Sequence, residues 1–166
     1  MQNKTLPLNA YFSFLNTENM GTWGYNYFES DAAFDYMDDI ENTDDPKDMI
    51  EDIFDEAIAG EYLDFDTGSA VIVAAAYVDR QLNGTRYSEP EIEDPLAVDS
   101  FATRHPDVDL ATLRGAAVEA LRKVQAEGSE LLELWQENEA ELPAWRQKID
   151  ELIARLESVR PPLRII

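Results

Sequence analysis

The feature that most constrains the fold is an uninterrupted apolar segment in the middle of the chain. Nine consecutive apolar residues occupy positions 70–78, within a longer segment over residues 66–83 that ends at Asn83-Gly84. The β-branched residues at 71–73 would suit a buried strand, but the apolar stretch is too long for one and ends as helices commonly do. A helix that is apolar on nearly all sides needs neighbours all round. We therefore predict a central helix over residues 66–83.

Cap residues and apolar residues at helical spacing predict the remaining helices. The predicted starting points are Ser30, Asp45-Pro46, Asp94-Pro95, Asp109, Ser129 and Pro143. No segment alternates polar and apolar residues well enough to build a sheet. The sequence therefore predicts an all-α single-domain bundle of six to seven helices over residues 20–160, with an irregular aromatic N-terminal segment and a C-terminal tail at 161–166.

A segment rich in aromatic residues precedes the first predicted helix. Gly21 and Gly24 bracket Trp23, and Trp23, Tyr25 and Tyr27 alternate along the chain. This pattern indicates an extended or tightly turned segment rather than a helix. We expect Gly21, Trp23 and Gly24 to form a structural turn in which Trp23 is buried against the helices.

Several landmarks together resemble one protein family. They are Met20-Gly21-Thr22-Trp23-Gly24, the acidic helix after residues 31–33, the alanine-rich helix, His105-Pro106, the run at 129–135 and Trp145. Their order is similar to that of the bacterial domain-of-unknown-function family 4259, over about residues 20–157. The resemblance implies a mostly helical bacterial protein, usually cytoplasmic, with no assigned activity. Family members commonly begin at the residue matching Met20, so we expect residues 1–19 to be a dispensable extension.

The net charge of −22 restricts the partners of the chain. The first 66 residues hold 17 acidic and two basic residues, whereas residues 96–166 hold 13 acidic and nine basic residues. Direct binding to nucleic acid or to anionic lipid is disfavoured, because both need cationic patches. A membrane span is not expected either, because the longest apolar run has nine residues and a spanning helix needs about twenty.

The usual signatures of catalysis and metal binding are missing from the sequence. There is no cysteine, and His105 is the single histidine. The acidic stretch that starts at Asp64 resembles a calcium loop, but its glycine stands one place early and its twelfth residue is Ala75. No phosphate-binding glycine loop occurs. We therefore predict no catalytic residue, metal site or cofactor, and we expect His105 to lie at a helix end.

The acidic faces of the first two predicted helices give the strongest functional indication. Like charges four residues apart, such as Asp35 with Asp39, cost a few tenths of a kcal/mol each. Local rules that are broken in one place often mark function. The predicted partner-binding residues are Asp35, Asp38, Asp39, Asp52 and Asp55, with Tyr25 and Tyr27 as the nearest aromatic anchors.

Three functional hypotheses follow from these observations. The first is a non-catalytic, cytoplasmic interaction module that docks a basic partner, as an immunity-like or nucleic-acid-mimicking inhibitor would. The second is a metal-dependent enzyme that uses clustered carboxylates. The third is a solubility or stress protein without a dedicated partner, whose acidity aids solubility or reflects adaptation to salt.

Overall fold

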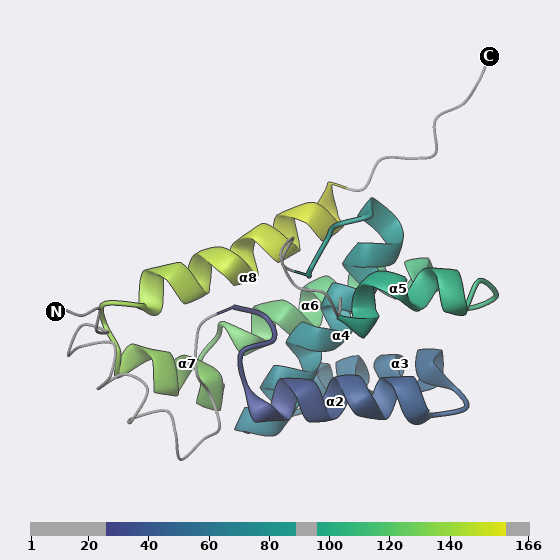
Figure 1. The fold of residues 1–166 in the computed structure, drawn as a ribbon. Coiled ribbons are helices and arrows are strands. Elements are labelled where there is room, and N and C mark those ends of the chain that lie inside the picture. The colour runs from purple at the N-terminus through teal and green to yellow at the C-terminus, as the bar shows by residue number, and fades with distance from the viewer. Residues whose placement is uncertain (1–25, 89–95, 159–166) are drawn as a thin grey trace, which may run out of the picture.

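The computed structural model describes residues 26–88 and 96–158, and these residues form a helical bundle (Figure 1). The all-α prediction is confirmed, since the described residues contain seven α-helices, one 3-10 helix and no strand longer than an isolated bridge. The elements are α2 (Asp31–Asn42), α3 (Pro46–Ala59), α4 (Phe65–Asn83), α5 (Ala97–Arg104), η1 (Ala111–Leu113), α6 (Arg114–Val124), α7 (Glu130–Gln136) and α8 (Leu142–Glu157).

Some predictions concern residues outside these ranges. Among them are the turn at Gly21, Trp23 and Gly24 and the aromatic residue Tyr25. The expected dispensability of residues 1–19 and the tail at 161–166 belong to the same group. All of these stay predictions.

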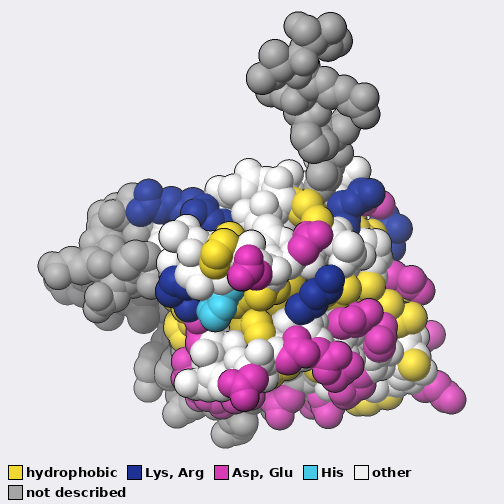
Figure 2. Space-filling model, turned by 90° about the vertical axis from the view of Figure 1, so that its right-hand side faces the viewer, with side chains coloured by type: hydrophobic (Ala, Val, Ile, Leu, Met, Phe, Trp, Pro, Cys, Tyr) yellow, Lys and Arg dark blue, Asp and Glu magenta, His cyan; other side chains and the backbone are white. Residues whose placement is uncertain are grey.

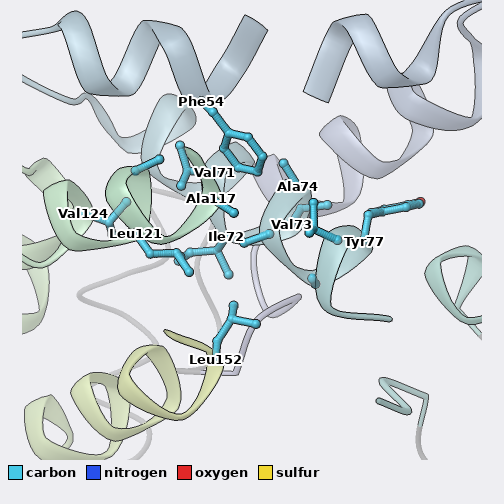
Figure 3. Close-up of a cluster of buried hydrophobic side chains, with 14 of the residues drawn as sticks. Phe54, Val71, Ile72, Val73, Ala74, Tyr77, Ala117, Leu121, Val124 and Leu152 are labelled. Carbon is cyan, nitrogen blue, oxygen red and sulfur yellow. The ribbon is translucent and has the colours of Figure 1, made fainter. Parts of the chain in front are cut away.

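Helix α4 occupies the centre of the bundle, as the apolar segment predicts. Every residue from position 68 to position 79 is buried. Each of the other helices of the described part contacts α4, and in Figure 1 α4 and α6 lie between α8 on one side and α2 and α3 on the other. Figure 3 shows side chains from three neighbouring helices around it, namely Phe54 of α3, Ala117, Leu121 and Val124 of α6, and Leu152 of α8.

Three helix starts follow the predicted caps, and the others differ by a few residues. Helix α5 begins at Ala97 rather than at Asp94-Pro95, and α8 begins at Leu142, one residue before Pro143. The side chains of Ser30, Asp45 and Ser129 accept hydrogen bonds from the backbone of the first turns of α2, α3 and α7. Helix α4 begins one residue earlier than predicted, because Asp64 serves as its cap. Asp109 accepts from the backbone N–H of Ala111 at 2.9 Å, but the turn that follows is η1, and α6 begins only after it.

Two connections between helices are tied together by a short backbone bridge. The Leu63 N–H donates to the Gly128 carbonyl at 2.7 Å, and the Glu130 N–H donates to the Leu63 carbonyl at 2.8 Å. Gly128 has a φ of +97°, and a Cβ atom at this position would lie 2.9 Å from the Glu61 carbonyl oxygen. The bridge therefore requires glycine for both conformation and space.

A second tie holds α8 against α4 through a buried charge. Asp79 is fully buried, and its Oδ2 atom accepts from Arg155 Nε at 2.9 Å and from the Tyr87 hydroxyl at 2.5 Å. Its Oδ1 atom accepts from Asn83 Nδ2 at 2.7 Å. A buried carboxylate with this many donors is stable only while they remain, since an unpaired charge in the interior is costly. The network also holds Tyr87, in the segment after α4, against the bundle.

We predict that Gly128→Ala lowers the free energy of unfolding by about 1–3 kcal/mol, because it strains a left-handed backbone and crowds a carbonyl oxygen. Gly115→Ala is the matched control, because a Cβ there meets no atom within 4 Å and alanine favours the helix. Chemical denaturation of both variants measures the difference. Equal stability of the two variants would contradict the role assigned to Gly128.

We predict that Asp79→Asn destabilises the fold by about 3 kcal/mol, the low end for breaking a buried pair, because Arg155 keeps some contact with solvent. Tyr87→Phe removes one neutral donor from the same carboxylate and is expected to cost about 1 kcal/mol. Urea denaturation of the two variants compares them. A loss for Asp79→Asn no larger than that for Tyr87→Phe would show that the charge pair is not what holds α8.

Candidate functional site

Carboxylates from three helices meet at one groove on the surface. The groove lies between α2, α3 and the first turns of α4 and has a volume of about 340 Å³. We call it the acidic groove, and its lining residues are Ala32, Asp35, Tyr36, Asp39, Ile53, Glu56, Asp66, Thr67 and Ala70.

Helical spacing and packing together build this groove. Asp35 and Asp39 are four residues apart and therefore lie on one face of α2. The Tyr36 hydroxyl donates to the Met49 carbonyl at 3.2 Å, which joins α2 to α3. The Thr67 hydroxyl donates to Glu56 Oε2 at 3.3 Å, which joins α4 to α3. The acidic rim is therefore held by contacts between helices rather than by one helix alone.

The electrostatic field in the groove is strongly negative. No Lys or Arg side chain is among the described residues that line it. Burial raises the pKa of the Tyr36 hydroxyl, and the carboxylates of Asp39, Asp52 and Glu56 raise it further, so this side chain stays a neutral phenol. Figure 2 shows the side of the molecule that is on the right in Figure 1, where most Asp and Glu side chains in view gather over the lower part and most Lys and Arg lie higher.

A comparison with protein-family models identifies the family to which most of the chain, including the groove, belongs. The family model described as Domain of unknown function (DUF4259) matches residues 21–148. The chain belongs to the DUF4259 family. The match contains every residue that lines the acidic groove, so the groove is part of the DUF4259 domain. Comparisons with curated proteins and with solved structures gave no match.

The DUF4259 domain brings only part of the predicted interface together. Asp35 and Asp39 line the groove, whereas Asp38, Asp52 and Asp55 are exposed on the same two helices but do not line it.

Of the two predicted aromatic anchors, only Tyr27 lies within the described residues, and it does not line the groove. Tyr25 lies outside the described residues. Tyr27 is half-buried, its hydroxyl donates to the Lys148 carbonyl at 2.6 Å, and its ring packs edge-on against Tyr87.

Sequence reasoning left three residues out of the predicted interface. Glu56 and Asp66 line the groove, and Tyr62 lies in the connection between α3 and α4. Tyr62 is 53% exposed, more than any other large apolar side chain of the described part, and its hydroxyl donates to Glu133 at 3.1 Å. The spacing of Glu56 from Asp52 was a usable signal, but nothing local places Asp66 beside α2.

Neither a metal-binding cluster nor a membrane-spanning helix occurs among the described residues. Within residues 26–88 and 96–158, no group of three or more His, Asp or Glu side chains is arranged to hold a metal ion. No helix in these ranges is long and apolar enough to cross a bilayer. His105 caps the C-terminal end of α5, and its ring packs on Phe101 at a centroid distance of 4.6 Å.

Neutralising the groove should stabilise the free protein. We predict that the triple variant Asp35→Asn, Asp39→Asn, Glu56→Gln has a free energy of unfolding about 0.5–1 kcal/mol higher than the native protein. The variant removes like-charge pairs along α2 and α3, and it also removes carboxylates near helix C-termini. The control is Glu119→Gln, Glu137→Gln, Glu139→Gln, which removes three exposed charges elsewhere. Thermal melts at low and high salt test the prediction. The stabilisation should become smaller as salt is added. An equal stabilisation of the control variant would show that the effect does not come from the groove carboxylates.

Proposed function

We propose that this DUF4259 protein is a non-catalytic, cytoplasmic binding module whose acidic groove accepts a basic segment of a partner protein. One observation supports this most: carboxylates from three helices surround a single hollow that also has apolar lining residues, and no Lys or Arg is among the described residues that line it. Carboxylates that serve only solubility do not need to surround a common hollow.

The groove is suited chemically to Lys and Arg side chains. Their methylene stems can pack on the apolar surfaces of Tyr36 and Ile53 while the cationic heads reach the rim. The rim charges attract a cation before contact and speed its approach. Tyr62 adds an exposed aromatic face in an acidic surrounding, where an Arg or Lys of the partner can stack.

A binding module of this kind fits an immunity-like or nucleic-acid-mimicking inhibitor. The natural targets of such inhibitors, nucleases and nucleic-acid-binding proteins, carry cationic surfaces that otherwise contact phosphates. The carboxylates on the surface of α2 and α3 can pair with those cations in place of phosphates. The proposal therefore names the partner by its chemistry, a protein with an exposed basic segment.

A basic peptide tests the groove directly. The probe is a twelve-residue peptide of Lys, Arg and Gly, titrated calorimetrically at moderate salt. The groove variant Asp35→Asn, Asp39→Asn, Glu56→Gln is expected to bind about tenfold more weakly than the native protein. The control variant at Glu119, Glu137 and Glu139 has the same net charge and is expected to lose no more than about twofold.

The two variants separate a specific site from general acidity. If both lose affinity equally, the peptide senses only net charge, and the groove has no special role. Four of the five predicted acidic residues give a further test: Asp35, Asp38, Asp52 and Asp55 changed together to Asn should weaken capture of basic cytoplasmic proteins. Undiminished capture at moderate salt would overturn the proposal.

A further inference from the structure

A second hollow in the molecule has the opposite chemical character. It has a volume of about 500 Å³, within the range of small-molecule sites, and it is framed by the turn before α2, the segment after α4, and α8. Its walls include the rings of Tyr27, Phe28 and Tyr87. We call it the aromatic pocket.

Basic side chains are concentrated at this pocket. Arg86, Lys148 and Arg155 line it, in a chain with 13 Lys and Arg against 35 Asp and Glu. Arg155 is paired with Asp79 behind the wall, but Arg86 and Lys148 form no salt bridge within the described residues.

Two carboxylates also line the pocket, and each accepts a hydrogen bond from a neutral donor nearby. Glu29 accepts from the Asn26 N–H at 3.0 Å, and Glu151 accepts from Gln147 Nε2 at 2.9 Å.

The aromatic walls are fixed in place before any ligand arrives. The Tyr87 ring packs edge-on against Tyr27 and Phe28, at centroid distances of 5.5 and 5.9 Å. The Arg155 guanidinium donates to the hydroxyls of Tyr27 and Tyr87 at 3.2 and 3.3 Å, while Asp79 holds Arg155 from behind. A pocket with prearranged walls loses little conformational entropy on binding.

We propose that the aromatic pocket binds a small anion that carries a flat apolar group, of the class of aromatic carboxylates. The flat group packs among the rings of Tyr27, Phe28 and Tyr87, and the anionic group lies toward Lys148 and Arg86. A purely apolar ligand leaves Arg86 and Lys148, whose Nζ lies 5.7 Å from the Tyr27 ring centroid, without an anionic partner. The site is separate from the acidic groove, which repels such an anion.

Matched pairs of probes test the proposal on the full chain. Indole-3-acetate and its neutral analogue indole-3-acetamide have nearly the same shape and differ in charge. Nuclear magnetic resonance titration follows the backbone amides of Tyr87 and Ser88, which lie at the pocket. The acid is expected to bind at least about tenfold more tightly than the amide. Phenyl phosphate in a parallel titration tells whether the site prefers carboxylate or phosphate.

A variant on α8 tests whether the ligand binds in the aromatic pocket. Lys148→Gln is expected to weaken binding of the acid about fivefold to tenfold. Arg146→Gln is the control, since Arg146 is on the same helix but does not line the pocket. Melting temperatures of both variants exclude unfolding as the cause. The proposal is overturned if no anion shifts these amides at millimolar concentration, if acid and amide bind equally, or if the two variants bind alike.

Discussion

Burial of α4 on all sides is the constraint on which the rest of the structure depends. Its apolar residues leave no face for solvent, so α2, α3, α5, α6, α7 and α8 each pack against it. A helix that gives its apolar stripe to α4 must turn its polar residues outward. For α2 and α3 these residues are mostly carboxylates, so the same packing that forms the core also forms the acidic surface. The burial of Asp79 near the end of α4 adds one polar requirement, which Arg155 on α8 meets.

The charges of this DUF4259 protein are separated in space rather than evenly mixed. The acidic groove lies where α2, α3 and α4 meet, whereas three of the basic side chains line the aromatic pocket by α8. Like charges held close together oppose folding, and salt weakens that effect. This arrangement underlies the two proposals, a basic segment in the acidic groove and a small anion in the aromatic pocket. Both hollows also have apolar surface, which adds selectivity that charge alone does not provide.

The residues of the candidate site could be predicted from the sequence only in part. Asp35 and Asp39 were predictable, because a helical repeat places them on the solvent side of a stripe that includes Met37 and Ile40. Glu56 and Asp66 join them only because α3 and α4 cross α2 at that point. Tyr25 and Tyr27 were predicted as the aromatic anchors because they are near the acidic helices in sequence, yet the Tyr27 side chain packs against α8. Tyr62, in a connection without any periodic pattern, is the residue that remains exposed.

The sequence by itself determined the helical class, the central place of the 70–78 segment, most helix boundaries and the outward direction of the acidic side chains. These properties follow from spacing along one chain segment, capping and apolar periodicity, which are local. Only the tertiary structure decided which carboxylates share a groove, that Leu63 pairs with Gly128 and Glu130, and that Asp79 finds Arg155 76 residues away. Contacts at such separations depend on how helices pack in three dimensions, and a one-dimensional pattern carries no direct record of that packing.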